Sequence, residues 1–545
     1  MPACLFLRRR LFSSSARSLH QVGSARPLFS PYQSQGLLNR THPFSRPFST
    51  SSSSLRKPKA ASSFWAITAT LVVIGGGTWV RDKYFNSSQE SPAVSSPQDT
   101  QYLQEPYLEV IDTLQTMPIE AAPGTVTQLT PEQEAKLREL WVLTLKVFGV
   151  KLDGETSSQS SSQGKKSKSG ASSLNLSDIT DGDDKYGQAK EFQQAIADIS
   201  PEEIRQSFWS MVKHDHPDSL LLRFLRARKW DIKKALIMMI STMRWRKVDA
   251  KVDEDIMMNG EHLALKQSQS SDPAEKKAGE EFLNQMRMGK SFLHGVDKAG
   301  RPICNVRVRA HKASDQSVEV MERYTVYIIE SARMLLAPPI ETATIVFDMT
   351  NFSLANMDYT PVKFMIKCFE ANYPESLGAV LVHKAPWIFS GIWSIIKGWL
   401  DPVVAAKVHF TKNAQDLEKF IPRNRIMKEL DGEEDWEYKY VEPQPGEDKL
   451  MEDTATRDRL LAERQELAKE MQAATISWIS ANSKNNKEAI ATATEERNKL
   501  VERLRAQYWE LDPYVRSRSF YDRLNIIQGD GKIEFYPNSE KKSTA

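Results

Sequence analysis

The sequence predicts an α/β fold in which a mixed or parallel sheet is covered by helices. Four short runs are rich in apolar residues and largely lack the polar alternation of half-exposed strands: "RPICNVRVRA", "TATIVFDMT", "AVLV" and "KVHF". Helical patterns separate these runs, which favours parallel pairing. We expect an N-terminal helical lobe at residues 190–260, the sheet domain at 282–432 and a C-terminal helical extension at 433–545.

A helix is expected in front of the helical lobe, at residues 129–150. Thr130 is placed to cap it, Pro131 occupies its first turn, and apolar residues follow from Leu137 onward. Residues 154–187 come next, and their low-complexity run "GETSSQSSSQGKKSKSGASS" is typical of a flexible linker. The helix is therefore expected to lie in a linker region, loosely tethered to the domain that follows.

The helical lobe contains an amphipathic helix that begins at Pro217, in "PDSLLLRFLRARKW". Leu221, Phe224 and Leu225 share one face because they are three or four residues apart. Arg228 stands seven residues after Leu221 and so places a cation on this apolar side. It is either a ligand contact or a cation at a helix C-terminus, where the dipole favours positive charge. The spacing leaves both alternatives open.

Further helices are expected between and after the strands. In chain order they are "VEVMERYTVYIIESARMLL", "PVKFMIKCFEAN", "WIFSGIWSIIKGWL" and "NAQDLEKF". The extension is strongly charged and predicts long helices at about residues 450–480 and 485–511. Close to its end, Gly529 and Gly531 favour a hairpin turn.

Charge divides the chain into two parts. The net charge is +3, but the first 81 residues contain eleven Lys and Arg and no acidic residue. Subtracting those eleven charges leaves −8 for residues 82–545. A mildly acidic body argues against a nucleic-acid-binding protein, which needs a basic footprint. The cysteines, Cys4, Cys304 and Cys368, are too widely spaced to indicate a disulfide framework or a zinc site.

The acid-free start is typical of a mitochondrial transit peptide over residues 1–48. The segment "MPACLFLRRRLFSSSARSLH" is rich in Arg and Ser, with apolar residues at intervals. The segment "SRPFSTSSSS" resembles the processing site of such presequences, with cleavage near Phe48. The alternative is a disordered basic tail.

Residues 64–80 are expected to form a membrane anchor. The run "FWAITATLVVIGGGTWV" is uncharged for 17 residues, close to the lower limit for crossing a bilayer. Trp65 and Trp79 lie near its two ends, as interfacial aromatic residues do. A transit peptide followed by an anchor suits the mitochondrial inner membrane, with the body facing the intermembrane space. The alternative is another organelle membrane, with the body facing the cytosol.

Sequence motifs for catalysis are incomplete or missing. The segment "MGKS" ends like a phosphate-binding loop, but Asn284 stands where its first glycine is required. A nucleophile elbow of the form Gly-x-Ser-x-Gly does not occur. His214 and His216 flank Asp215, but a loop that enters a helix accounts for them better than a metal site does. We therefore expect neither an enzyme nor a metal centre.

The helix "WIFSGIWSIIKGWL" has an apolar face wider than packing against one sheet requires. It is either a core helix buried on two sides or a helix that covers an apolar cavity and touches a membrane. The residues expected to form this cover and line the cavity are Trp387, Phe389, Ile392, Trp393, Ile396, Trp399 and Leu400.

Several ordered motifs resemble the CRAL-TRIO lipid-exchange domain of fungal phosphatidylinositol/phosphatidylcholine transfer proteins. They are "LLLRFLRARKWD", "DKAGRPI" and "NYPESLGAVLVHKAPWIFSGIWSIIKGWLDPVVAAKV", and the resemblance covers about residues 190–432. It implies a helical lobe in front of an α/β lobe that holds one lipid under a mobile gating helix, which matches "WIFSGIWSIIKGWL". It also implies that the phosphoinositol headgroup is held by Arg228, Lys229, Glu375 and Lys407.

Two departures from the family pattern concern hydroxyl groups. Val404 stands where phosphatidylinositol-binding members carry a threonine, and Ala343 and Ile345 stand where members that bind phosphatidylcholine carry hydroxyls. The resemblance implies a lipid ligand as the sole bound molecule, without another cofactor, and a membrane surface as partner. The alternatives are a lipid-sensing scaffold whose C-terminal helices bind a protein, and a carrier of a sterol-like or hydrocarbon lipid.

Overall fold

The structure is a computed structural model that describes residues 121–151 and 184–536. The expected transit peptide, the expected anchor at residues 64–80 and nearly all of the expected linker lie outside these residues. Within the described ranges, none of the helices combines the length and the apolar character needed to cross a membrane.

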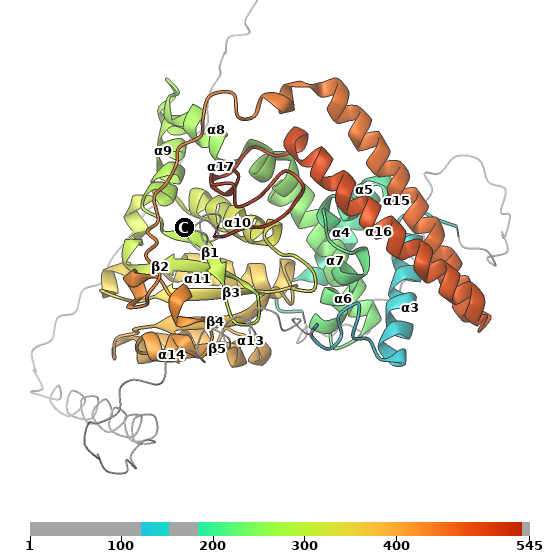
Figure 1. Cartoon of the computed structure of the whole chain (residues 1–545), viewed down its shortest axis with the longest axis horizontal. Helices are drawn as coiled ribbons and strands as arrows, with labels where there is room; N and C mark the ends of the chain where they lie inside the picture. Colours follow the sequence, from blue (N-terminus) through green and yellow to red (C-terminus); the bar gives the residue numbers. More distant parts are fainter. Residues whose placement is uncertain (1–120, 152–183, 537–545) are drawn as a thin grey trace, which may run out of the picture. The chain divides into compact units, whose positions relative to one another are not determined.

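The helical lobe precedes the sheet in the chain, and Figure 1 shows its helices gathered beside the sheet. Its helices are α3 (Pro131–Val147), α4 (Gln188–Asp198), α5 (Pro201–Val212), α6 (Pro217–Ala227) and α7 (Ile232–Arg244). The helix expected in the linker region is α3, and it belongs instead to this lobe. Leu140 and Trp141 are fully buried in the lobe core, and Trp141 Nε1 donates to Asp218 Oδ1 at 2.7 Å. Tertiary packing therefore anchors α3.

The prediction of a mixed sheet in an α/β fold is confirmed. The strands, in spatial order, are β1 (Ser291–Val296), β2 (Pro302–Arg307), β3 (Ala343–Asp348), β4 (Leu377–His383) and β5 (Val408–Thr411). β1 pairs antiparallel with β2, and the remaining pairs are parallel. β1 was missed by sequence reasoning because His294 and Gly295 interrupt its apolar pattern. In the fold, His294 stacks on Trp436 with ring centroids 3.7 Å apart.

Helices surround the sheet and connect its strands. They are α8 (Met258–Ser268), α9 (Pro273–Arg287), α10 (Val318–Met334), α11 (Tyr359–Lys367), α12 (Phe389–Lys397), α13 (Pro402–Ala406) and α14 (Ala414–Glu418). The helix expected over "PVKFMIKCFEAN" begins earlier, at Tyr359, and its last part is the π-helical turn η8 (Cys368–Asn372). The Asp358 side chain caps its start by accepting from the Thr360 N–H.

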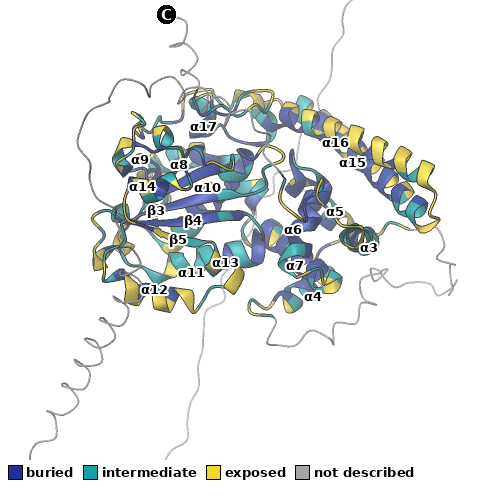
Figure 2. Cartoon of the chain, turned by 60° about the horizontal axis from the view of Figure 1, so that its bottom comes forward, coloured by how far each residue is buried: buried dark blue, intermediate teal, exposed yellow. Residues whose placement is uncertain are grey.

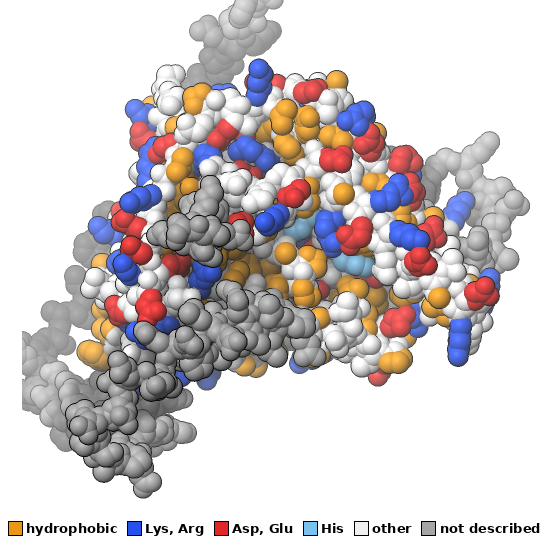
Figure 3. All heavy atoms as spheres, viewed as in Figure 1, with side chains coloured by type: hydrophobic (Ala, Val, Ile, Leu, Met, Phe, Trp, Pro, Cys, Tyr) orange, Lys and Arg blue, Asp and Glu red, His pale blue; other side chains and the backbone are white. Residues whose placement is uncertain are grey.

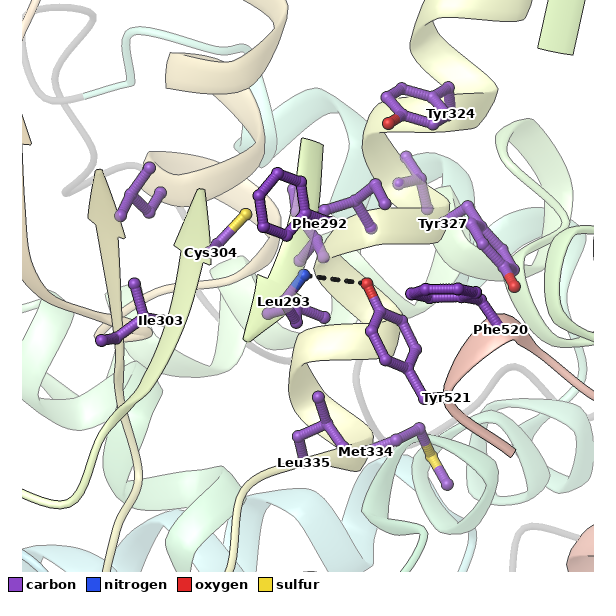
Figure 4. Packing of buried hydrophobic residues seen from close by; sticks show 14 of the residues in the cluster. Phe292, Leu293, Ile303, Cys304, Tyr324, Tyr327, Met334, Leu335, Phe520 and Tyr521 are labelled. Atoms are coloured by element: carbon purple, nitrogen blue, oxygen red, sulfur yellow. Dashed lines mark hydrogen bonds between the residues drawn. The ribbon is translucent and has the colours of Figure 1, made fainter. Parts of the chain in front are cut away.

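The two faces of the sheet have different surroundings, since one face packs against side chains of the core and the other borders a cavity. Alternate residues of a strand point to opposite faces, so Ile345 and Val380, which line the cavity, face away from Val346 and Leu381, although all four belong to the main core. Figure 4 shows part of this core, where Tyr521 near the C-terminus reaches β1 and its hydroxyl accepts from the Leu293 N–H at 3.0 Å. The face that carries Ile345 borders a cavity.

The C-terminal extension packs on both lobes. It contains α15 (Thr454–Ser483), α16 (Lys487–Val515) and α17 (Phe520–Arg523). The inner faces of α15 and α16 add residues such as Met471 and Leu504 to the core of the helical lobe. Figure 2 shows these inner faces buried and the outer faces exposed. α17 joins the core of the α/β lobe through Phe520 and Tyr521, so the extension contributes to both cores.

Candidate functional site: an apolar cavity under helix α12

A cavity of about 270 Å³ lies against the sheet and is bordered by α10, α11 and α12. Its lining is largely apolar, and the helices contribute side chains that include Met321, Ile328 and Ile329 from α10 and Val362, Met365 and Ile366 from α11. An apolar cavity of this kind favours a ligand with a large hydrocarbon portion, because such a ligand loses contact with water on entering.

Strand register assembles one wall of the cavity. Cys304 pairs with Ile345, and Ile345 pairs with Val380, so that these three side chains line the cavity side by side. Ala343 also lines it. Thr344 lies on the opposite face and donates its hydroxyl to Asp297 Oδ2 at 2.6 Å. Ala343 and Ile345 therefore both face the cavity, and neither supplies the hydroxyl that the resemblance implies for members that bind phosphatidylcholine.

Helix α12 covers the cavity with only part of the residues predicted for this role. Four of the predicted residues line the cavity: Phe389, Trp393, Ile396 and Leu400. Ile392 is buried nearby but does not line it, and Trp399 packs edge-on against Tyr359 with ring centroids 5.3 Å apart. Trp387 does not line the cavity, because it precedes the helix and is 87% exposed, and its expected place in the cover stays a prediction.

The outer side of α12 is open to solvent. The residues exposed there are Ser390, Gly391, Ser394 and Lys397, and Ile395 is 48% exposed. Figure 2 shows exposed residues along this helix. The alternative of a core helix buried on two sides is therefore wrong. The helix has one apolar side against the cavity, and isolated large apolar groups remain on its outer side.

Glu375 and Lys407 meet at one end of the sheet. Glu375 precedes β4 and Lys407 precedes β5, and the Lys407 Nζ lies 3.5 Å from the Glu375 Oε2. Both side chains are half-buried. Glu375 has a φ of +54°, which is uncommon for a residue with a Cβ and is found preferentially at ligand sites. The backbone carbonyl of Glu375 accepts from Arg223 Nη1 at 3.1 Å, a contact from the helical lobe.

Arg228 and Lys229 occupy the C-terminal end of α6. Arg228 Nη2 donates to Gln188 Oε1 at 2.5 Å, while Lys229 is exposed and has a φ of +51°. The residues that line the cavity in the described part of the chain include neither of these two, nor Glu375 or Lys407. Of the four predicted headgroup residues, the structure pairs Glu375 with Lys407.

Glu370, which sequence reasoning missed, ties down the chain just after α12. Its carboxylate accepts from Lys185 Nζ at 2.8 Å, from the Tyr186 hydroxyl at 2.7 Å and from the Asp401 N–H at 2.7 Å. Lys185 also donates to the Trp399 carbonyl. Burial and the bond to Glu370 raise the pKa of Tyr186 well above its ordinary value. These partners are far apart in the sequence, so no local pattern could have revealed the cluster.

Comparison with known proteins decides the family. Two family models match: CRAL/TRIO, N-terminal domain, at residues 188–241 and CRAL/TRIO domain at residues 286–432. A CRAL-TRIO domain-containing protein of Schizosaccharomyces pombe is 42% identical, over 74% of this chain and 92% of that protein. The chain belongs to the CRAL-TRIO family. Phosphatidylinositol transfer protein CSR1 of Eremothecium gossypii is 41% identical, over 74% of this chain and 98% of that protein.

The CRAL-TRIO assignment confirms the resemblance found in the sequence and identifies a family of lipid-binding and lipid-transfer proteins. The N-terminal domain match contains Arg228 and Lys229, and the CRAL-TRIO domain match contains Glu375, Lys407 and the whole of α12. All of the residues that line the apolar cavity, from Lys290 to Val408, lie within the second match. The cavity is thus the candidate lipid site of this CRAL-TRIO chain.

The two histidines considered as metal ligands have structural positions in this CRAL-TRIO chain. His214 is buried against the rings of Tyr508 and Trp509, and burial lowers its pKa to about 4. The His216 Nδ1 accepts from the Asp218 N–H at 3.0 Å and so caps α6. Among the described residues, no group of His, Cys, Asp and Glu side chains is arranged to hold a metal ion.

Proposed function

We propose that this protein binds one phospholipid of the phosphatidylinositol class and exchanges it at a membrane surface. The observation that carries the proposal is the apolar cavity covered by α12, with the Glu375–Lys407 ion pair at one end of the strands that line it. An ammonium and a carboxylate are suited to the phosphate and the hydroxyls of an inositol headgroup. The relative named as a phosphatidylinositol transfer protein supports the same ligand class.

Helix α12 acts in this proposal as the gate of the cavity. A two-chain phospholipid hides on the order of thirty methylenes, so at ~0.8 kcal/mol each about 25 kcal/mol must be matched by apolar surroundings. Opening a cover inside a bilayer avoids exposing those methylenes to water. Trp387 and Ile395 are large apolar side chains exposed at this cover, which supports docking of α12 on the membrane.

Vesicle transfer tests the proposal. The full chain, reconstituted into acceptor vesicles, should accelerate the arrival of labelled phosphatidylinositol from donor vesicles relative to vesicles without protein. Phosphatidylcholine should be transferred poorly, because Ala343 and Ile345 offer no hydroxyl to the cavity. Bound lipid without transfer would instead favour a lipid-sensing scaffold, with the C-terminal helices as the protein-binding part.

The proposed place of action is the mitochondrial inner membrane, with the body facing the intermembrane space. Its support is the sequence alone: the acid-free, Arg-rich residues 1–48 and the uncharged residues 64–80. Deletion of residues 1–48 should abolish mitochondrial import and leave membrane insertion intact, as measured by fractionation and carbonate extraction. Continued import of the shortened chain contradicts the targeting proposal.

A sterol-like or hydrocarbon lipid is the second candidate ligand. Val404 lines the cavity at the position where the resemblance implies a threonine in phosphatidylinositol-binding members, and the four predicted headgroup residues do not line it. These features favour a ligand recognised through its apolar body. Mass spectrometry of lipids that co-purify with the full chain separates the candidates, since phosphatidylinositol and neutral lipids differ in mass and headgroup fragments.

A further inference from the structure

The cavity has a second polar end that the proposed headgroup site does not use. Lys290 lines the cavity, is only 2% exposed and lies just before β1. The Lys290 Nζ contacts the His311 Nδ1 at 3.2 Å and donates to the Gln316 Oε1 at 2.9 Å. His311 and Gln316 are buried as well. A buried cluster built around a cation is costly in a cavity otherwise suited to hydrocarbon.

Strand geometry places this cluster opposite the Glu375–Lys407 pair. The Lys290 carbonyl accepts from the N–H of Arg307, the last residue of β2, whereas Glu375 and Lys407 precede the first residues of β4 and β5. Because β2, β3, β4 and β5 run parallel, the two polar clusters lie at opposite ends of the strands. The seven residues of β4 correspond to a separation of roughly 20 Å.

The charge of Lys290 is only partly balanced by the protein. Among the described residues, no carboxylate forms an ion pair with it, and burial lowers its pKa to about 8 despite the fields of Asp315 and Asp358. Asp358 also lines the cavity, and its Oδ2 lies 3.4 Å from the His311 Nε2, on the side of this ring away from the Nδ1 that contacts Lys290. Burial, followed by the Lys290 ammonium, lowers the pKa of His311, which keeps this ring neutral and able to accept at Nδ1.

An ammonium has three N–H donors, and His311 and Gln316 account for two of them. A phospholipid that enters tail first from the Glu375–Lys407 end brings only the methyl end of an acyl chain to the third N–H of Lys290. An anionic oxygen at this position would instead form a charge-assisted hydrogen bond in a dry environment. The residues that line the cavity extend from Lys290 to Ser376 and Val404 near the opposite end of the strands, a path that a long acyl chain can follow.

We infer that the cavity also binds a long-chain fatty acid, with its carboxylate on Lys290 and its chain along the sheet wall. This inference uses the lipid cavity of the proposed function but not the headgroup assignment. Photoreactive palmitate, crosslinked to the full chain, provides the probe, and competition with unlabelled palmitate or hexadecanol provides the affinities. Hexadecanol has the same chain without the negative charge.

The wild-type protein should prefer palmitate over hexadecanol. Lys290→Met should weaken palmitate binding by about ten- to a hundredfold, the value of one charge-assisted hydrogen bond, and leave hexadecanol binding unchanged. Lys276→Met, at an exposed lysine of α9, is the matched control and should behave as the wild type. The inference is overturned if wild type binds both compounds equally, a result that needs no variant, or if Lys290→Met keeps the preference for palmitate.

Phosphatidylinositol transfer, measured on the same preparations, distinguishes failure of the proposed function from failure of the fatty-acid site. If palmitate preference depends on Lys290 while phosphatidylinositol is not transferred, the proposed headgroup function fails and the fatty-acid site stands. If phosphatidylinositol is transferred by wild type and by Lys290→Met alike, and palmitate is not preferred, the fatty-acid site fails and the proposed function stands.

Discussion

At the scale of single residues, Glu375 combines an uncommon backbone conformation with a paired charge. Its φ of +54° directs the chain into β4, and its carboxylate lies 3.5 Å from the Lys407 ammonium. Because both side chains are half-buried, the pair keeps contact with solvent and a headgroup can compete for either partner. Buried pairs such as Arg246 with Glu330 lack that access.

We expect Glu375→Ala combined with Lys407→Ala to weaken phosphatidylinositol binding by about ten- to a hundredfold, because losing one charged hydrogen bond costs roughly 1.5–3 kcal/mol. A lipid recognised only through its apolar body should bind as before. The matched control is Glu495→Ala with Lys499→Ala, which removes an exposed ion pair on α16. Equal phosphatidylinositol affinity of the two double variants, measured with lipid vesicles, contradicts the headgroup role.

His214 provides a pH-dependent test of the interface between the helical lobe and α16. Its ordinary pKa is 6.5, and burial lowers it to about 4. Between these values the unfolded chain binds a proton that the folded chain does not, so the free energy of unfolding falls as the pH is lowered. A shift of this size corresponds to about 3 kcal/mol.

The variant His214→Phe should lose less stability than the wild type when the pH is lowered from 7 to 4. The measurement is denaturant unfolding at a series of pH values, followed by tryptophan fluorescence. His409→Phe, at an exposed histidine of β5, serves as control and should retain the wild-type pH dependence. A pH dependence of His214→Phe identical to that of wild type contradicts the assignment.

At the scale of elements, α12 has two chemically different sides. Phe389 and Ile396 face the cavity, whereas Ser390 and Ser394 face solvent. Aspartate at Trp393 or Ile396 would therefore disturb the cavity itself in addition to membrane docking. Trp387 and Ile395 are exposed, so substitutions there address docking alone.

Trp387→Asp with Ile395→Asp should abolish or strongly reduce binding of the protein to vesicles through α12 while leaving the unfolding midpoint close to that of the wild type. Exposed substitutions outside special sites usually change stability by less than about 0.5 kcal/mol. The readout is the rate of lipid transfer to vesicles that lack the protein. Leu450→Asp, at a position that is 48% exposed in the C-terminal extension, is the control. Transfer at the wild-type rate contradicts membrane docking through α12.

At the scale of the whole molecule, Asp218 joins three helices distant in sequence. Its Oδ1 accepts from Trp141 Nε1 of α3 at 2.7 Å and from Arg497 Nη2 of α16 at 2.6 Å. Arg497 also lies over the Trp478 ring of α15, 4.4 Å from its centroid. The C-terminal helices are thus held by buried polar contacts in addition to apolar packing. Their outer faces, by contrast, carry interspersed acidic and basic side chains, as Figure 3 shows for α15 and α16.

Asp218→Ala should lower the free energy of unfolding by about 3–5 kcal/mol, because it leaves the Arg497 guanidinium buried without its carboxylate. Denaturant unfolding followed by circular dichroism measures the loss. Glu470→Ala removes the exposed partner of Arg503 and should cost about 0–1 kcal/mol. Similar losses in the two variants contradict the role of Asp218 in fastening the helices.

Local patterns in the sequence determined much of this protein. The apolar runs predicted β2, β3, β4 and β5, and the caps and periodicity predicted many of the helices, though not α8 or α9, because these signals depend on residues within one turn or one strand. The motifs around Arg228 and Glu375 identified the CRAL-TRIO family. The resemblance also implied that Glu375 and Lys407 serve one site, and the structure places the Lys407 Nζ 3.5 Å from the Glu375 Oε2.

Only the tertiary structure decided which surfaces these elements bury. It placed α3 in the helical lobe, left Trp387 in solvent, and enclosed Lys290 at the far end of the cavity. It also joined Glu370 to Lys185 across 185 positions of sequence. Burial and pairing of this kind depend on contacts between residues distant in the chain, and neither periodicity nor local composition encodes which distant face a side chain meets.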